Sequence, residues 1–458
     1  MTQLLDIPLL TSVAQRTPVF QKTGQVTGAN GLIQASLRSA IGECCQIDLP
    51  NGRMVRAETV GFDGQSSLLM PYENNYRLEP GLPVRCTGMQ RQVDVGPELL
   101  GRVIDGLGRP VDGRAAPRTL KSRSPHAAPP NSLQRQRIDQ PLVTGQRAID
   151  TMLTLGMGQR VGLFAGSGVG KSTLMGEIAR NSNATVNVVA LVGERGREVR
   201  PFIEDSLQAA GLQRSVVVVA TSDESPLMRI NAVLTAIAIA EDYRDQGVNV
   251  LFFLDSLTRL AMAQRELGIL LGEHPVNRGY PPSVMSLMAQ TLERLGTSHN
   301  GSITGIVTVL VDGDDMDEPI ADAARSILDG HIVLQRELAA AGHFPAISVL
   351  DSVSRLFREV TDVPHQQATA TVRELLASYA EMKDMIEIGA YQKGTVPTVD
   401  RAIHFMPIIR HFLCQSVGET FSLPESSEDL LLLSNAIAAQ GAATAQGAAT
   451  LQTARANA

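Results

Sequence analysis

Runs of apolar residues recur through the middle of the chain, between about residues 135 and 355. Five of these runs are almost continuously apolar and rich in β-branched residues: RVGLFA, VNVVALV, SVVVVA, NVLFFLD and SITGIVTVLV. The segments between them, such as KSTLMGEIARN, PFIEDSLQAAG and LMRINAVLTAIAIAEDYRDQG, have the apolar spacing of helices. Continuous apolar strands that alternate with helices indicate a parallel sheet buried on both faces, so the pattern predicts an α/β core.

The pattern changes on both sides of this core. From about residue 23 to 92, short β-favouring runs alternate with turn signals such as NG, DG and EPG, which predicts a small all-β module. After about residue 360 the spacing is helical, as in TATVRELLASYAEMKDMIEIG and PIIRHFLCQSV, which predicts a helical domain. Because 458 residues exceed what one core usually organises, two or three domains are expected.

A segment without hydrophobic periodicity separates the β module from the α/β core. Residues 114–131 (RAAPRTLKSRSPHAAPPN) are rich in proline, serine and basic residues, which favours an extended connector along the surface. Just before it, LLGRVIDGLGRPVDG repeats the Asp-Gly pair at the spacing of turns. We therefore predict that the chain leaves the β module here and crosses to the core.

The two ends of the chain carry weaker signals. Five apolar positions near the start have the spacing of a short amphipathic helix: Leu4, Leu5, Leu9, Leu10 and Val13. This pattern is compatible with a docking helix and equally with a frayed tail. The last two dozen residues contain AQGAAT twice in succession, and such a composition cannot build a core. A disordered tail is therefore predicted.

Charge and composition narrow the classes of partner. The formal net charge is −7 and no block dense in lysine or arginine stands out, which disfavours affinity for nucleic acid. The apolar N-terminus is interrupted by Asp6 and Pro8 and lacks a basic start, so a signal peptide is not expected. No run reaches the roughly 18 apolar residues of a membrane span. A soluble cytoplasmic protein is predicted, with any membrane contact peripheral.

The cysteines agree with that compartment. They are four in number, without a C-x-x-C pair or a regular framework: Cys44, Cys45, Cys86 and Cys414. Such spacing is typical of reduced thiols in a cytosolic protein, so we interpret all four as core or incidental residues.

The segment LFAGSGVGKSTL (163–174) nearly matches the phosphate-loop pattern G-x-x-x-x-G-K-[ST], with Ala165 in place of the first glycine. It lies between a predicted strand and a predicted helix, where glycines let backbone N–H groups surround phosphates. Lys171 would reach the β- and γ-phosphates, and the Ser172 hydroxyl would coordinate Mg²⁺. The alternative is an ordinary glycine turn. Because Ala165 ends the strand, the departure leaves the phosphate cradle whole.

Two carboxylates follow other predicted strands. Asp255 ends NVLFFLD, where an unsatisfied carboxylate would be costly, so it is the candidate for the metal side of the site. A helix-capping role is the alternative. In ALVGERGREV, Glu194 is the candidate for the group that activates the attacking water. It is followed closely by Arg195, Arg197 and Glu198, and the alternative for this stretch is a solvated charge cluster.

Several motifs together resemble a known family: AGSGVGKS, GERGREV, LDSLTRLAMAQRE, GYPPSV, ILDGHIVL, GHFPAISVLDSVSR and IGAYQKG. In this order they are similar to the catalytic ATPases of bacterial flagellar protein export, over about residues 24–430. These are related to injectisome secretion ATPases and to the β subunit of the F-type ATP synthase. The resemblance implies a RecA-like P-loop core with a parallel sheet, preceded by a small N-terminal β-barrel and followed by a C-terminal helical domain.

With this resemblance the chain divides into six predicted segments. They are the N-terminal segment 1–22, the β-barrel domain 23–95, the connector 96–134, the RecA-like domain 135–358, the helical domain 359–434 and the tail 435–458.

The resemblance also assigns roles to residues. Nucleotide binding falls on the loop and the start of its helix: Ala165, Gly166, Ser167, Gly168, Val169, Gly170, Lys171, Ser172 and Thr173. Glu194 becomes the general base and Asp255 the Walker-B acid, while Arg195 and Glu198 support the phosphate and metal sides. Arg355 would be an arginine finger that enters the nucleotide site of a neighbouring subunit. Phe344 matches the aromatic residue that stacks on adenine.

Alternatives remain for the last two residues and for the departures from the family pattern. Arg355 could equally be a surface ion-pair residue, and Phe344 a core aromatic beside Pro345. The segment SVMSLMAQTLERLG lacks the usual Leu-Pro, Val396 stands where an acid is common, and the first 22 residues carry few charges. The basic membrane- and stator-binding helix of the family is therefore in doubt here.

The function implied is that of a Mg²⁺-dependent ATPase, in a homohexameric ring at the cytoplasmic face of a flagellar export apparatus. It would release export substrates from chaperones, help to unfold them and pass them to the membrane gate, in contact with a stator or regulator protein. The alternatives are an injectisome ATPase and a rotary ATP synthase subunit. A non-catalytic nucleotide-binding subunit is disfavoured by Glu194, and an RNA translocase by the acidic charge and few aromatic residues.

Overall fold

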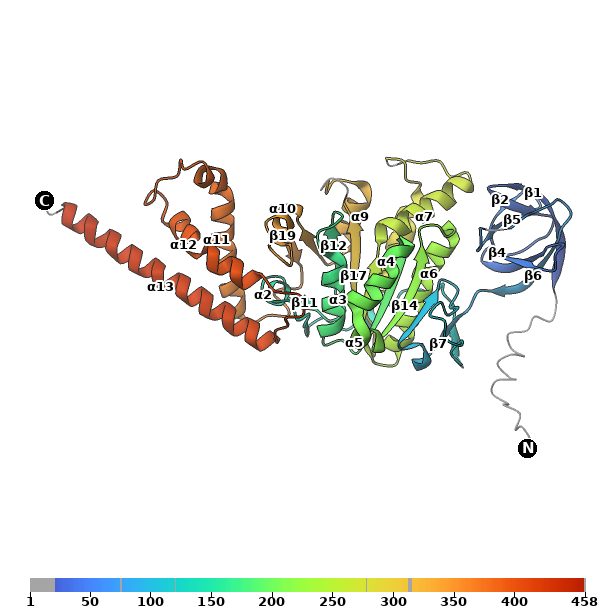
Figure 1. Cartoon of the computed structure of the whole chain (residues 1–458), viewed down its shortest axis with the longest axis horizontal. Coiled ribbons are helices and arrows are strands. Elements are labelled where there is room, and N and C mark those ends of the chain that lie inside the picture. Colours follow the sequence, from blue (N-terminus) through green and yellow to red (C-terminus); the bar gives the residue numbers. More distant parts are fainter. Residues whose placement is uncertain (1–20, 75, 120, 277, 312–314, 457–458) are drawn as a thin grey trace, which may run out of the picture.

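The computed structural model describes residues 21–456 except 75, 120, 277 and 312–314. The predicted N-terminal docking helix lies almost entirely outside the described residues. Three parts follow one another along the long axis of the molecule: a barrel, a sheet covered by helices, and a group of helices from which one long helix projects (Figure 1). The predicted fold class, a β-barrel followed by an α/β core and a helical domain, is confirmed.

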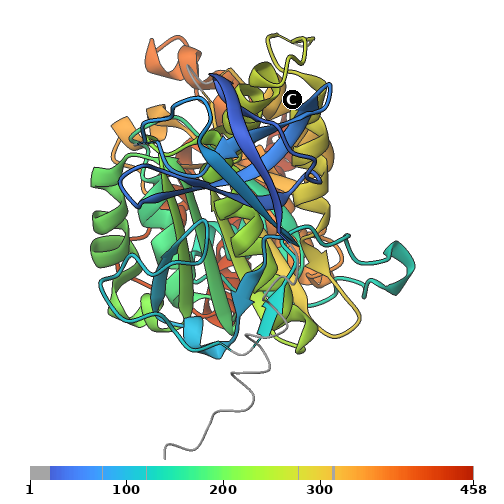
Figure 2. The same ribbon diagram turned by 90° about the vertical axis from the view of Figure 1, so that its right-hand side faces the viewer.

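The N-terminal barrel is a closed sheet of six antiparallel strands. Its order is β1 (Lys22–Asn30), β2 (Leu32–Ala35), β5 (Ser66–Pro71), β4 (Met54–Asp63), β3 (Glu43–Asp48) and β6 (Pro83–Gln90), which pairs again with β1. Alternate side chains point inward and form a small separate core that includes Ile33, Ile47 and Val84. Viewed from the barrel end, it lies in front of the central sheet (Figure 2).

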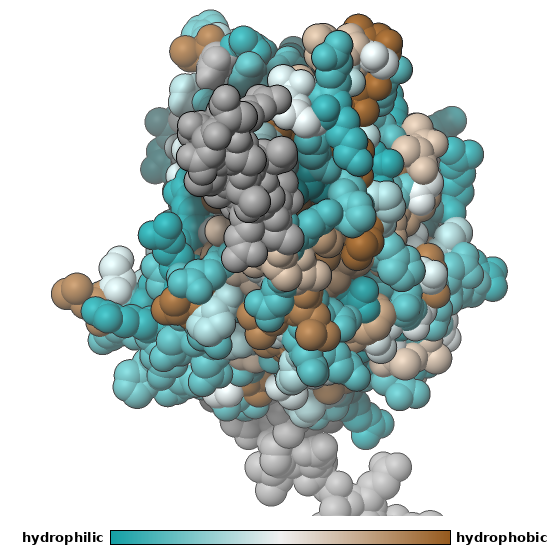
Figure 3. All heavy atoms as spheres, turned by 90° about the vertical axis from the view of Figure 1, so that its left-hand side faces the viewer, coloured by the Kyte–Doolittle hydropathy of each residue, from teal (hydrophilic) through white to brown (hydrophobic). Residues whose placement is uncertain are grey.

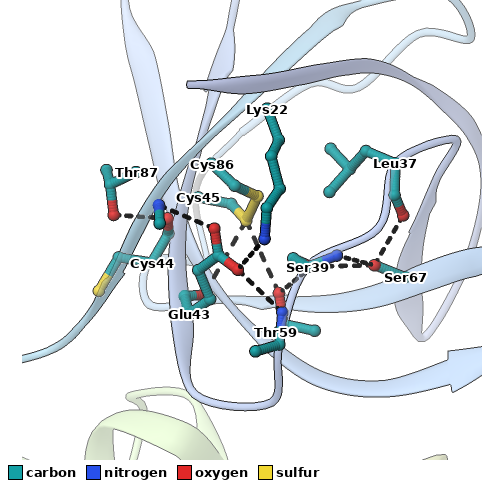
Figure 4. The surroundings of a disulfide bond; sticks show 12 residues. Lys22, Leu37, Ser39, Glu43, Cys44, Cys45, Thr59, Ser67, Cys86 and Thr87 are labelled. Atoms are coloured by element: carbon teal, nitrogen blue, oxygen red, sulfur yellow. Dashed lines mark hydrogen bonds and ion pairs between the residues drawn. A yellow bond between two sulfur atoms is a disulfide. The ribbon is translucent and has the colours of Figure 1, made fainter. Parts of the chain in front are cut away.

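The barrel corrects the prediction for the cysteines. Cys45 on β3 and Cys86 on β6 are paired in register, both are buried, and they form a disulfide (Figure 4). Cys44 and Cys414 are free thiols, as predicted. The pair is 41 residues apart and is brought together by strands that are not consecutive in the chain. Spacing along the sequence therefore could not reveal it.

The central sheet follows the predicted parallel pattern. Its strand order is β19 (Ile347–Ser354), β18 (Gly330–Leu334), β12 (Arg160–Ala165), β17 (Ser302–Leu310), β15 (Asn249–Asp255), β13 (Val186–Glu194), β14 (Ser215–Thr221) and β8 (Arg102–Asp105). The strands from β18 to β8 are parallel. Edge strand β19 and the short β16 (Gly296–Thr297) pair antiparallel with their neighbours. All five apolar runs of the sequence form strands here.

Helices cover both faces of this sheet, which explains why its strands are apolar throughout. In β15, Val250, Phe252 and Leu254 belong to one core, and Leu251 and Phe253 belong to the other. The first core contains α6 (Pro226–Asp245), α7 (Leu257–Leu270), α8 (Pro282–Glu293) and α9 (Pro319–Ile327). The second contains α2 (Arg147–Met152), α3 (Lys171–Asn181) and the C-terminal helices.

The segment predicted as a connector contributes structure of its own. After the 3₁₀ helix Pro97–Leu99, residues Arg102–Asp105 form β8, which adds a parallel edge strand to the central sheet next to β14. Further along, β9 (Lys121–Arg123) pairs with β7 (Val93–Val95). The prediction of an extended connector therefore holds only for part of 96–134. Four residues are too short a run for periodicity to distinguish a strand from a turn.

The C-terminal helices are α11 (Val363–Glu387), α12 (Pro397–Leu413) and α13 (Leu423–Ala456). Helix α13 corrects the prediction of a disordered tail, because it continues without a break through residues 435–456 (Figure 1). Alanine and glutamine are good helix formers and the stretch has no proline, so helix is locally favourable even without a core. On the visible part of this end of the molecule, hydrophobic residues are interspersed with hydrophilic ones (Figure 3).

A buried ion pair joins α6 to the residue that follows α8. The Arg294 guanidinium donates to both oxygens of Glu241, from Nε to Oε1 over 2.9 Å and from Nη2 to Oε2 over 2.8 Å. The two side chains are 4% and 1% exposed. The nearest other cation, Arg123 Nη2, lies 3.8 Å from Glu241 Oε2. Loss of Arg294 would therefore leave a buried carboxylate with one distant partner.

We expect Arg294→Ala to lower the free energy of unfolding by about 3 kcal/mol, because an uncompensated buried charge is costly. Unfolding in urea, followed by circular dichroism, measures the change. Arg200→Ala is the control, since the ion pair of Arg200 with Glu204 is exposed and should contribute less than about 1 kcal/mol. Equal losses in the two variants would contradict the expectation.

Candidate nucleotide-binding and catalytic site

The predicted phosphate loop connects β12 to α3. Ala165 is the buried last residue of β12 and pairs with strands on both sides, which is why an alanine fits there. Gly168 and Gly170 have positive φ angles of 81° and 90°, a conformation that favours glycine. A Cβ atom at Gly168 would meet nothing within 4 Å, so this part of the loop faces open space. The start of α3 and its free N–H groups lie beside it, an arrangement suited to an anion.

Lys171, the first residue of α3, contacts two carboxylates. Its Nζ atom donates to Asp255 Oδ1 over 2.5 Å and lies 3.7 Å from Glu194 Oε1. Asp255 ends β15 and Glu194 ends β13, and these strands are adjacent in the sheet. Because parallel strands end at the same edge, three residues far apart in the sequence meet at the phosphate loop.

Asp255 is held from two sides. Its side chain is only 4% exposed, and Oδ1 accepts a second hydrogen bond, from Thr308 Oγ1 over 2.7 Å. Both of these bonds go to the same oxygen. Thr308 lies in β17, between the strands of the loop and of Asp255. Sequence reasoning missed Thr308, although a hydroxyl inside the apolar run SITGIVTVL was the available signal.

Glu194 has the electrostatic environment of a base that works near neutral pH. Burial, followed by the negative charge of Asp255, raises the pKa of Glu194 to about 7, while Lys171 opposes the increase. A hydrogen bond with the Glu198 carboxyl raises it further. A carboxylate with this pKa can accept a proton from water more readily than an ordinary glutamate.

The other charges after Glu194 are exposed. Arg195 is 65% exposed and lies 3.5 Å from Glu198, which is 46% exposed. Both belong to the start of α4 (Gly196–Pro201) or its cap, and Arg197 is exposed as well. In the absence of nucleotide, these three residues form a solvent-exposed cluster of charges. Their predicted roles beside phosphate and metal stay predictions.

The predicted magnesium ligands offer the right kind of atom. Ser172 is exposed in the first turn of α3, and Asp255 and Glu198 supply carboxylate oxygens. Hydroxyl and carboxylate oxygens are hard ligands, and Mg²⁺ usually retains waters and uses phosphate oxygens for the rest. Within the described residues no group of three histidine, cysteine, aspartate or glutamate side chains could hold a metal alone. The oxygen atoms of these residues are therefore suitable ligands for a Mg²⁺ ion that is also coordinated by the phosphates of a bound nucleotide.

A pocket of about 230 Å³ lies between the phosphate loop and the C-terminal domain. Its lining includes Val169, Gly170, Phe344, Gln415, Ser416 and Val417. The Phe344 side chain is 45% exposed, and its ring lies 3.9 Å from where a Cβ on Gly170 would be. This geometry disfavours a core role for Phe344. The pocket has the size and the aromatic wall of a site for a flat ring.

Arg355 lies outside this group of residues. It follows β19, is exposed, and donates from Nη2 to the backbone oxygen of Arg325 over 3.0 Å. It lines a separate pocket of about 380 Å³ together with Arg358 and Arg373. That pocket and the one beside Phe344 share no lining residue. Arg355 is therefore not part of the Phe344 pocket, and its predicted role as an arginine finger stays a prediction.

The loop, its lysine and the two strand-end carboxylates together define a P-loop nucleotide-binding site of the ATPase type. The matched families agree with it. Residues 145–354 match the ATP synthase alpha/beta family, nucleotide-binding domain, and residues 361–431 match the T3SS EscN ATPase C-terminal domain.

Relatives extend the similarity to nearly the whole chain. The flagellum-specific ATP synthase of Bacillus subtilis (strain 168) is 49% identical over 424 residues, 92% of this chain and 97% of that protein. That of Salmonella typhimurium is 46% identical, over 91% of this chain and 94% of that protein. The type 3 secretion system ATPase of Xanthomonas euvesicatoria is 44% identical, over 93% and 98%. The assembled ATPase EscN of enteropathogenic E. coli has a TM-score of 0.84 and 43% identity, over 90% of this chain and 100% of that one.

The chain belongs to the family of flagellum-specific ATP synthases and type III secretion ATPases, and it is an ATPase of that export family. In the part of the chain that the structure describes, every helix is too short or too polar to cross a membrane.

Proposed function

We propose that this chain hydrolyses Mg²⁺-bound ATP with Lys171, Glu194 and Asp255, in a ring of six identical subunits that serves flagellar protein export. The observation that carries the chemical part is the position of Lys171 between the two carboxylates, at the mouth of the phosphate loop. One cation and two anions at this point provide phosphate binding, a base and a metal side in one place.

The residues divide the work according to their positions. The N–H groups of the loop from Ala165 to Gly170, with Thr173 on the first turn of α3, surround the phosphates. Lys171 neutralises the β- and γ-phosphates once they compete with Asp255 for its ammonium group. Ser172, Asp255 and Glu198 would hold Mg²⁺, which supplies charge neutralisation on the phosphates when bound.

Glu194 takes the proton of the attacking water. Its pKa of about 7 leaves a large fraction of the carboxylate ionised at neutral pH and makes it a better proton acceptor than a free glutamate. Arg195, which follows it directly, would support the phosphates. Phe344 stacks on the adenine ring, with the pocket of about 230 Å³ around it.

The proposal of a ring rests on Arg355 and on a relative. EscN is described as an assembled ATPase, and also in complex with its central stalk EscO, at a TM-score of 0.83 to this chain. Arg355 is exposed and lines a pocket separate from the one beside Phe344, so it is accessible to a neighbouring subunit. We propose further that a stator or regulator protein, export chaperones and the membrane gate are partners, with release and unfolding of export substrates as the work done. The site would lie at the cytoplasmic face of the apparatus, with membrane association peripheral.

Flagellar export is favoured over an injectisome by sequence identity. The flagellum-specific relatives of Bacillus, Treponema, Salmonella and Borreliella are 49%, 48%, 46% and 44% identical, and the type 3 secretion ATPases of Xanthomonas and Pseudomonas syringae are 44% and 45% identical. The injectisome is the second candidate because the C-terminal match is named for EscN. Expression in a motile bacterium lacking its flagellar ATPase should restore swimming. Failure there, with rescue of an injectisome mutant, would favour the second candidate.

Hydrolysis by a ring predicts a rate per subunit that rises steeply with protein concentration and is at least about 100-fold lower in Arg355→Ala, with ADP affinity within about threefold. Steady-state ATPase assays with mass determination, and calorimetry for ADP, measure these quantities. Arg358→Ala, in the same pocket, is the matched control and should stay active.

Mixing variants gives the sharper test of action between subunits. An Arg355→Ala subunit has an intact phosphate loop, and a Lys171→Ala subunit has an intact Arg355. In mixed rings a Lys171→Ala subunit supplies Arg355 to the intact phosphate loop of an Arg355→Ala neighbour, so ATPase activity should reappear. An inactive mixture, or a fully active monomer, would contradict the action of Arg355 in a neighbour.

A further inference from the structure

The pocket beside Phe344 is lined on one side by Gln415, Ser416 and Val417, which belong to the wall 414–419 at the start of the connection from α12 to α13. Gln415 is the only buried residue of this wall, with 8% of its surface exposed, although its side chain is polar. A buried amide group is costly unless its hydrogen bonds are made. Its partners therefore show what the residue holds in place.

Gln415 bonds to two other segments beside the pocket, Phe344 and residues 145–147. Its backbone N–H donates to the Phe344 carbonyl over 2.8 Å. Its side-chain Oε1 accepts from Arg147 N over 3.0 Å, and Nε2 donates to the Gly145 carbonyl over 2.8 Å. Nε2 also donates to the Glu419 carbonyl over 2.5 Å, a hydrogen bond within the wall itself. The backbone of Phe344 and the segment before α2 are thus joined through one residue.

The same wall is tied to the helix of the phosphate loop. Glu177 of α3 is 4% exposed and accepts a hydrogen bond from Gly418 N over 3.0 Å. Gln146, between the two residues that the Gln415 side chain holds, also lines the pocket. The elements that would face a base therefore have fixed distances from the elements that would face its phosphates.

We propose that Gln415 is a positioning residue for the base of the bound nucleotide. It holds Phe344, residues 145–147 and the wall at the separation that admits a flat ring, and so it acts on affinity and not on the chemical step. This inference rests on the proposed function, because it takes a nucleoside phosphate to be the ligand. A ligand with phosphates but no base should not depend on Gln415.

The test compares ADP with inorganic tripolyphosphate on the full chain by calorimetry. In Gln415→Ala we expect ADP to bind about tenfold more weakly and tripolyphosphate to bind within twofold of the original chain. The KM for ATP should rise by a similar factor while kcat stays within twofold. Gln136→Ala is the control, because Gln136 also donates to a backbone carbonyl but lies by residues 297–299, at the opposite end of the sheet strands.

Gln415→Glu provides a second variant of the same size. It keeps an acceptor for Arg147 N and loses the donor to Gly145, so it should show the same selective loss of ADP affinity; it decides the question if Gln415→Ala does not fold. Unchanged ADP affinity, or equal losses for ADP and tripolyphosphate, would overturn the proposal. An original chain that does not hydrolyse ATP would instead contradict the proposed function.

Discussion

Lys171→Ala is expected to abolish hydrolysis and to weaken binding of ADP and ATP at least about 100-fold. The variant removes the side chain that joins the phosphate loop to both carboxylates, and with it the ammonium group that would neutralise the phosphates. It also leaves Asp255, 4% exposed, beside Glu194 without the cation between them. Calorimetry with ADP and a steady-state ATPase assay measure the two losses.

The control for this prediction is Lys121→Ala, an exposed lysine on the short strand β9. It removes the same charge from the chain and should change neither quantity. Circular dichroism checks that both variants fold. Nucleotide affinity within threefold of the original in a folded Lys171→Ala variant would contradict the assignment of the loop.

Glu194→Gln is expected to keep nucleotide binding and to lower kcat at least about 100-fold, the usual range for loss of a general base. The amide fills the same space but cannot accept a proton. The original chain should in addition lose kcat/KM as the pH falls below about 7, because the raised pKa means that the base becomes protonated there. Single-turnover hydrolysis measures the loss in the variant. For the original chain, kcat/KM is measured over about 1.5 pH units on either side of pH 7.

Glu204→Gln is the matched control, since Glu204 is an exposed carboxylate shortly after α4 whose partner is Arg200. It should leave both the rate and the pH profile unchanged. Hydrolysis by Glu194→Gln at the original rate would show that another group activates the water. An unchanged pH profile in that variant would point to the same conclusion.

The central site could be predicted from the sequence because its residues stand at strand ends. A carboxylate directly after an apolar run, as with Asp255 and Glu194, has only one edge of a parallel sheet on which to lie. The same logic places the phosphate loop after β12. Local signals of this kind do not depend on the order of strands in the sheet, so they can be recognised from the sequence alone.

Features that depend on pairing between distant segments were not accessible in this way. The Cys45–Cys86 bond needs the closure of the barrel, and the hydrogen bonds of Gln415 need the C-terminal domain to reach residues 145–147. Thr308 carried a signal that was available but weak, because it is one of three hydroxyl residues in an otherwise apolar strand. The tail shows that a composition unable to build a core can still form a helix, because its local helix propensity favours α13.

Strand β8 has a consequence for how the domains can be separated. It lies upstream of the predicted core, yet it forms the outer edge of the central sheet and pairs with β14 from Val216 to Val219. A shortened chain that began after residue 134 would leave the N–H and C=O groups of β14 open along an apolar strand, a surface prone to intermolecular pairing. The ATPase unit is therefore larger than its sequence motifs suggest, and its boundary lies before Arg102.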